Sequence, residues 1–249
     1  MGNQIDIAPV MDAFDAGDEC PFCFMERKAE QSTIRFVVGP SASYMESDVR
    51  GATDKLGFCR CHTQKLYDYG NSLGAALILQ TYFAGILEEL QAQSKHLKPG
   101  KKSLLGKRAA LSQESYAGRL QNKVDSCFIC DRMDYHMQRY LRTFFHLLKD
   151  GDFRKKVENS KGFCLRHFSQ LLEAAQTMLP GSYETWFYDT VPAVTEKNLL
   201  RVKEDLDWFI AKFDYRNAGA DWKNAKDALS RTMQKLQGMY PADPPYKKD

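Results

Sequence analysis

The sequence lacks most of the features that give a function away. Its 249 residues carry a formal net charge of only +3, so composition gives no electrostatic argument for binding nucleic acid or an anionic membrane. Residues 1–14 hold no basic stretch ahead of an apolar run, as a secretory signal would. The most apolar run, 73–87, is shorter than the ~20 residues that span a bilayer and contains Gln80 and Thr81. We therefore expect a cytoplasmic protein that does not enter a membrane.

Catalytic signatures and strand patterns are missing as well. The sequence contains no GxSxG motif, P-loop, dinucleotide-binding fingerprint or HExxH motif, and its carboxylates form no evident acid–base pair. It also has no run of alternating apolar and polar residues bounded by turn residues. With 43% hydrophobic residues it can still build a core. The expected fold class is all-α.

What the sequence does contain is one cysteine–histidine pattern, written twice. Each copy is a CxxC pair followed by GFCxxH, with 35 residues (24–58) or 33 residues (131–163) between the second cysteine of the pair and the cysteine of GFCxxH. Chance would not place so specific a pattern twice with nearly equal spacers. The residues concerned are Cys20, Cys23, Cys59 and His62 in the first copy, and Cys127, Cys130, Cys164 and His167 in the second.

Three thiolates and one imidazole are a donor set typical of tetrahedral zinc. In a reducing compartment, cysteines three residues apart indicate metal ligands before disulfides. We interpret each copy as one structural zinc site, with two zinc ions expected. Two alternatives remain open: an iron–sulfur cluster, and a reactive zinc thiolate that accepts an alkyl group. Cys61 aligns with Arg166 of the second copy, so we expect it to be a free thiol.

The helical pattern suggests two pseudo-repeated halves, each with a Cys3His site, and a C-terminal helical section. Residues 1–19 are expected to form a loosely ordered lead-in with a short turn of helix. One long helix is expected from Cys59 to Pro99, with Leu79, Phe83 and Ile86 on its apolar stripe. The expected divisions are 1–97 (first repeat with its metal site), 98–120 (basic linker), 121–180 (second repeat with its metal site), 181–240 (helices packing on the repeats) and 241–249 (frayed tail).

The C-terminal section carries the remaining candidate site. Pro192 predicts a kink or a new helix start, and a last helix is expected over 222–239, with Asp221 as its cap. The segment 207–217 is dense in aromatic residues and ends in polar ones. Those polar residues either bond to one another locally or form the edge of a ligand pocket. The pocket candidates are Asp214, Tyr215, Arg216 and Asn217.

Three elements together resemble a known family: the CPxC opening at Cys20, the two GFCxxH motifs, and the stretch DLDWFIAKFDYRN at 205–217. They are similar to the uncharacterised bacterial proteins of domain-of-unknown-function family 6062, over about residues 20–231. The resemblance implies a soluble bacterial protein with no established reaction. It supplies no catalytic residues. The second CxxC lacks the proline of the first, which matters little for ligation.

We therefore expect a zinc-stabilised binding or adaptor protein rather than an enzyme, with an unknown protein or small molecule as its ligand. The rival class is a redox or group-transfer enzyme acting at the metal thiolates. The basic run 95–108 is expected to be a surface loop, with docking of an acidic partner as the alternative. Nucleic acid is not an expected partner, and the sequence does not indicate an oligomeric state.

Overall fold

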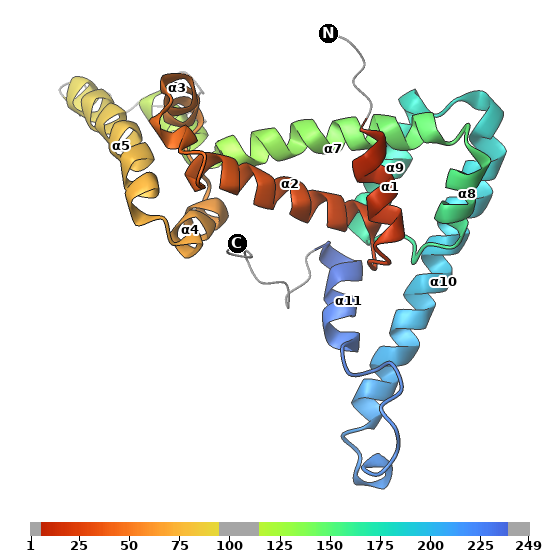
Figure 1. The fold of residues 1–249 in the computed structure, drawn as a ribbon. Coiled ribbons are helices and arrows are strands. Elements are labelled where there is room, and N and C mark those ends of the chain that lie inside the picture. Colours follow the sequence, from red (N-terminus) through yellow and green to blue (C-terminus); the bar gives the residue numbers. More distant parts are fainter. Residues whose placement is uncertain (1–5, 95–114, 239–249) are drawn as a thin grey trace, which may run out of the picture. The chain divides into compact units, whose positions relative to one another are not determined.

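The computed structural model describes residues 6–94 and 115–238 (Figure 1). These residues form helices joined by turns and contain no strand, which confirms the all-α prediction. The helices are α1 (Ile7–Asp15), α2 (Pro21–Val38), η1 (Ser43–Met45), α3 (Ser47–Leu56), α4 (Arg60–Tyr69), α5 (Ser72–Ser94), α6 (Tyr116–Asp125), α7 (Phe128–Leu147), α8 (Gly151–Glu158), α9 (Leu165–Met178), η2 (Gly181–Tyr183), α10 (Glu184–Ala211), η3 (Tyr215–Asn217) and α11 (Ala228–Gln237).

The chain divides into two compact units. Within the described residues, unit 1 comprises 6–29 and 135–238, and unit 2 comprises 30–94 and 115–134. Both internal boundaries fall inside helices, one in α2 and the other in α7. Each unit therefore contains residues from both copies of the cysteine–histidine pattern.

Unit 1 is built around a cluster of phenylalanine rings. Phe22, Phe144, Phe153 and Phe163 are fully buried, and the rings of Phe22 and Phe144 meet at a centroid distance of 5.8 Å. The fifth ring is Phe14 of α1, which packs edge-on against Phe153 at 5.1 Å. The short turn of helix expected within residues 1–19 is present as α1, but it is longer and more firmly packed than expected, because its apolar face completes this core.

Unit 2 has a smaller core and a largely exposed helix. Buried Ile34, Leu66, Ile78 and Ile129 form its centre. The single helix expected after Cys59 is two helices, because Gly70 takes a left-handed conformation (φ 87°) and ends α4. The apolar stripe expected on α5 is also largely exposed, with Phe83 63% accessible.

α5 is also longer than the apolar run 73–87 that the sequence analysis considered as a membrane span. Its 23 residues make it long and apolar enough, by length and composition, to cross a membrane. Only 11% of its most apolar 18-residue window is buried within the described chain.

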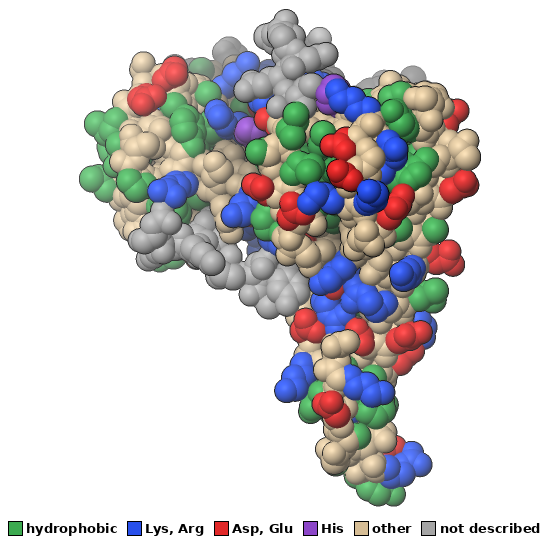
Figure 2. All heavy atoms as spheres, turned by 45° about the vertical axis from the view of Figure 1, so that its right-hand side comes forward, with side chains coloured by type: hydrophobic (Ala, Val, Ile, Leu, Met, Phe, Trp, Pro, Cys, Tyr) green, Lys and Arg blue, Asp and Glu red, His purple; other side chains and the backbone are tan. Residues whose placement is uncertain are grey.

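The C-terminal helices depart from the predicted breaks. No new helix starts at Pro192, because α10 continues through it, and α11 begins at Ala228 rather than at residue 222. Asp221 caps no helix; its carbonyl accepts a hydrogen bond from Trp208 Nε1 at 2.9 Å. Acidic and basic side chains are interspersed along α10 and α11 (Figure 2). Of the predicted basic linker 98–120, α6 covers the last residues; the run 95–108 and the tail 241–249 lie outside the described residues.

Candidate metal centres

Four side chains of unit 1 form the first cluster, here called site A. They are Cys20, Cys23, Cys164 and His167, all buried, with ligand atoms within 4.8 Å of one another. The Sγ atoms of Cys23 and Cys164 are 3.6 Å apart. His167 Nδ1 lies 3.5 Å from Cys20 Sγ, 3.4 Å from Cys23 Sγ and 3.2 Å from Cys164 Sγ. One nitrogen thus faces three sulfurs across a common centre.

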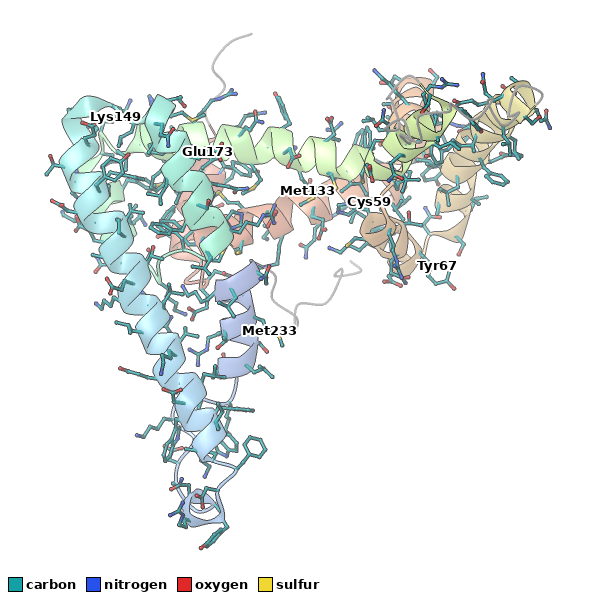
Figure 3. All side chains as sticks on the ribbon, turned by 180° about the vertical axis from the view of Figure 1, so that it is seen from behind. Cys59, Tyr67, Met133, Lys149, Glu173 and Met233 are labelled. Carbon is teal, nitrogen blue, oxygen red and sulfur yellow. The ribbon has the colours of Figure 1, made fainter. Side chains whose placement is uncertain are left out.

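Four side chains of unit 2 form the second cluster, site B. They are Cys59, His62, Cys127 and Cys130, and again all ligand atoms lie within 4.8 Å of one another. His62 Nδ1 is 3.3 Å from each of the three sulfurs. Cys59 lies at the start of α4, near Met133 of α7 (Figure 3). Cys59 and Cys130 are only half-buried, so site B is more accessible than site A.

The pairing differs from the sequence prediction. Each copy was expected to form its own site, whereas each cluster combines the CxxC of one copy with the CxxH of the other. The length of the helix after each CxxC explains this. α2 carries the chain ~22 Å from Cys23 to Val38 before it turns, and α7 carries it similarly far from Cys130. The CxxH that follows along the chain therefore meets the other CxxC pair.

The donor atoms fit a tetrahedral metal ion. With bonds of about 2.3 Å to sulfur and about 2.0 Å to nitrogen, a tetrahedral ion sets sulfurs about 3.8 Å apart and sulfur and nitrogen about 3.5 Å apart. The observed Sγ–Sγ distances are 3.6 Å at site A and 3.9 Å at site B. Sulfur–nitrogen distances run from 3.2 to 3.5 Å. The eight side chains are therefore arranged to hold one ion in each cluster.

The glycine of each GFCxxH motif shapes the turn that presents the ligands. Gly57 and Gly162 have φ angles of 61° and 70°, a region that favours glycine. A Cβ on Gly162 would lie 2.9 Å from Thr195 Cα, and one on Gly57 would lie 2.5 Å from the Tyr82 hydroxyl. The cysteine two residues later takes an extended conformation at the helix N-cap, and the histidine lies in the first turn on the same side.

In each cluster, interactions with the neighbouring side chains lower the pKa of one thiol and raise the pKa of another. At site A, hydrogen bonds from Cys20 and Cys23 lower the pKa of Cys164, and the bond to Cys164 raises the pKa of Cys23. Burial alone would lower the pKa of His167, but Cys164 and Cys20 raise it to about 10. Three adjacent thiolates repel each other, so a divalent cation is what would let all of them ionise.

Site B shows the same electrostatic pattern. Burial would raise the pKa of Cys127, but its hydrogen bond with His62 lowers that pKa to about 6. Burial would lower the pKa of His62, but Cys127 and Glu30 raise it to about 10. The pKa of Cys130 is raised, first by burial and then by the charge of Cys127.

A carboxylate from α2 lies behind each histidine, but only the one at site B is within hydrogen-bonding distance of the ring. At site B, His62 Nε2 lies 3.0 Å from Glu30 Oε1, and Lys65 pairs with the same carboxylate. At site A, His167 Nε2 lies 3.7 Å from Glu26 Oε2, while Arg166 pairs with Glu26 at 2.8 Å. A carboxylate behind a ligating histidine fixes the ring and strengthens its donor nitrogen. No sequence pattern marks these glutamates, because only the pairing of the ligands brings them behind the rings.

Each cluster consists of two half-sites, a CxxC pair from one sequence copy and a CxxH pair from the other. A hydrogen-bonded contact links the two half-sites of each cluster. In site B this link is direct, since Phe128 N–H donates to the carbonyl of Gly57 at 2.9 Å. In site A a buried lysine from α11 provides it. Lys235 Nζ donates to the carbonyls of Glu19 at 2.6 Å and Lys161 at 2.5 Å, which lie just before the two ligand segments.

The remaining candidates from the sequence lie apart from the clusters. The side chains of Asp214 and Arg216 bond to each other, Asn217 Nδ2 donates to the Ala211 carbonyl, and Tyr215 is 87% exposed. These bonds match the local alternative, and the ligand pocket stays a prediction. Cys61 is exposed and takes no part in site B.

A groove in unit 1 was not predicted. It has a volume of about 360 Å³ and is almost entirely apolar. Its walls come from α10 and α11 and include Leu199, Val202, Leu206, Thr232, Lys235 and Leu236.

The fold and the sites define an all-α protein with two Cys3His clusters suited to metal ions. The model of the family described as "Family of unknown function (DUF6062)" matches residues 1–243, and the chain belongs to this family. No curated protein and no solved structure matches the chain. Family membership confirms the resemblance drawn from the motifs and supplies no reaction.

Proposed function

We propose that this protein is a zinc-stabilised helical binding or adaptor module with two structural zinc ions. The observation that carries the proposal is the completeness of both clusters. Each offers four protein donors at tetrahedral spacing, which leaves no position for the water or substrate that a hydrolytic zinc needs. When bound, zinc would cross-link the helix starts on which the ligands lie and so stabilise each unit.

The spacing of the donors favours a single zinc ion over an iron–sulfur cluster. In a cluster the cysteines bind separate irons, which spreads their sulfurs further than a single ion does. Here all donor atoms of a site fall within 4.8 Å of one another. At site B, the Glu30 carboxylate that is bonded to His62 is also a common partner of zinc-bound imidazole.

A reducing compartment such as the cytoplasm suits this chemistry. All seven cysteines are free thiols, and six of them are ligands in the proposal. An oxidising compartment would favour disulfides between cysteines this close, and the clusters would then be lost.

The groove between α10 and α11 is our candidate for a binding surface. Its apolar walls suit an apolar small molecule or an apolar side chain of a partner protein. The mixed charges around it give no field of one sign, which argues against nucleic acid as the ligand (Figure 2).

The test of the proposal is the metal content of anaerobically purified protein, measured by elemental mass spectrometry together with a visible absorption spectrum. We expect about two zinc ions per chain and no colour. Iron and sulfide with a broad visible band would contradict structural zinc and favour a redox role.

A second candidate is group transfer at site B, which the partial exposure of Cys59 and Cys130 favours. A metal-bound thiolate there would attack an alkyl donor and form a sulfur–carbon bond, while the leaving group departs with its electron pair. Stoichiometric alkylation of Cys59 or Cys130 by methyl iodide with full retention of metal would support this candidate. Metal release on alkylation, or protection of both thiols by the metal, would support the structural role.

A further inference from the structure

α5 presents an unusual amount of apolar surface. Among the described residues it packs on α3, η1 and α4, using Gly74 and Ile78 as its buried positions (Figure 1). Its other side exposes five large apolar side chains: Leu73 (68%), Leu79 (36%), Phe83 (63%), Leu87 (40%) and Leu90 (42%). Together they leave on the order of 500 Å² of apolar surface, at the upper end for the largest patch of a monomer.

The exposed residues follow a coiled-coil register. Positions 73, 76, 80, 83, 87 and 90 are separated by three and four residues in alternation, which is the a/d spacing of a heptad. The residues at these positions are Leu73, Ala76, Gln80, Phe83, Leu87 and Leu90, and all six are exposed. We call them the α5 seam. Leu79 and Ile86 flank it at g positions. An apolar repeat of 3.5 residues is the repeat of paired helices in a coiled coil, so the seam favours another helix as its partner over a flat surface.

The opposite side of α5 is tied to its own unit by polar bonds. Thr81 Oγ1 donates to Asp54 at 2.8 Å, and Arg50 donates to the carbonyl of Leu77 at 3.3 Å. Near the end of the helix, Arg119 pairs with Glu89 at 3.3 Å. Crossing a membrane would break these bonds and carry Glu88 and Glu89 towards the hydrocarbon region, at several kcal/mol for the charges alone. α5 is therefore better placed to receive a helix than to enter a bilayer.

We propose that the α5 seam pairs with the α5 seam of a second copy of this chain. The seam is self-complementary, because its apolar a and d residues run the length of the helix and its acidic residues Glu88 and Glu89 lie outside it, at b and c positions. Pairing two copies covers on the order of 1,000 Å², about the lower limit for a specific interface. Gln80 is the one polar residue of the seam, and a single polar a residue is a device that sets register in such pairs.

The test is sedimentation equilibrium of the zinc-loaded full chain over a concentration series. We expect the wild type to approach twice its 28.5 kDa mass and to dissociate on dilution. Phe83→Glu should raise the dissociation constant about 100-fold or more, since both copies bring a charge into the seam. The matched control is Tyr67→Glu, which alters an 80% exposed aromatic residue of the same unit outside α5 and should dimerise like the wild type.

Helix content by circular dichroism and the content of bound metal show whether the variants fold. If Phe83→Glu fails that check, Leu73→Glu, at a 68% exposed position, replaces it with the same expected loss. A wild type that stays monomeric throughout, or a seam variant that dimerises like the control, overturns the proposal. The proposal is also overturned if the wild type is monomeric and binds phosphatidylcholine–phosphatidylglycerol vesicles, and if Phe83→Glu abolishes that binding. The α5 seam would then be a membrane-binding surface. None of these results depends on which metal the clusters hold.

Discussion

The sulfurs of Cys23 and Cys164 lie 3.6 Å apart although 141 residues separate them along the chain. This contact joins the CxxC of the first sequence copy to the CxxH of the second, and Cys59 and Cys130 make the reciprocal contact at 3.9 Å. The repeat is therefore not two successive metal modules. It is a pair of interleaved half-sites, each needing the distant copy to be complete.

Loss of one ligand should remove one ion and destabilise one unit. For Cys130→Ala we expect about one zinc ion per chain instead of two, and a clearly lower melting temperature, because metal binding contributes folding free energy directly. The measurement is zinc content combined with thermal unfolding followed by circular dichroism. The control is Cys61→Ala, at an exposed cysteine outside both clusters, which should keep two ions. Full metal and full stability in Cys130→Ala would contradict its role as a ligand.

The carboxylate behind His62 should tune metal affinity without binding metal itself. Glu30→Gln removes the charge that faces His62 Nε2 at 3.0 Å, and we expect site B to bind zinc roughly 10–100-fold more weakly. Competition with a chromophoric chelator measures this, with site A as the internal reference. Glu88→Gln, at an exposed glutamate of α5, should leave both affinities unchanged. Equal affinities in Glu30→Gln and Glu88→Gln would show that Glu30 does not support the site.

Lys235 should be a stabilising residue of unit 1. In Lys235→Met the carbonyls of Glu19 and Lys161 lose their donor and the buried Glu19 carboxylate loses a partner, so we expect a cost of about 2–5 kcal/mol in unfolding free energy. Urea denaturation of the zinc-loaded protein gives this value. Lys203→Met on α10 breaks an exposed pair with Asp207, which solvent screens, and should leave the unfolding free energy close to that of the wild type. Similar values for the two variants would refute the role assigned to Lys235.

The glycine of the second GFCxxH motif should not tolerate a side chain. Gly162→Ala forces a Cβ to 2.9 Å from Thr195 Cα at a positive φ, so we expect at least ~1–2 kcal/mol of destabilisation and weaker metal binding at site A. Gly51→Ala is the comparison, because this glycine lies within α3 with nothing near its Cβ position. That change should stabilise the protein by ~0.5–1 kcal/mol. Denaturant unfolding of both variants checks the opposite signs.

Local chemistry made much of this structure predictable. The CxxC and GFCxxH spacings pointed to the eight residues that the structure gathers into two clusters, and the helical periods gave α2, α7 and α9 within a few residues. The pairing was not predictable, because it depends on how far α2 and α7 carry the chain before it turns. The break at Gly70 was not predicted, because the apolar stripe that indicated the helix begins only at Leu79 and is silent about the residues before it.

Two further misses have their cause in tertiary contacts. The stripe that includes Phe83 has the spacing of a core face but lies exposed, since periodicity shows that a helix has an apolar side and not what covers it. Pro192 does not interrupt α10, although proline removes one hydrogen bond from a helix interior. Buried neighbours such as Phe187 and Val191 hold that part of the helix in place.

Zinc stoichiometry in two double variants tests the interleaved arrangement most directly. Cys23→Ala combined with Cys164→Ala removes two ligands of site A, so about one zinc ion per chain should remain at site B. Cys23→Ala combined with Cys59→Ala removes one ligand from each site, and the chain should then retain no tightly bound zinc. The reverse result, no zinc in the first variant and one ion in the second, would mean that each copy closes its own site and would contradict the interleaved pairing.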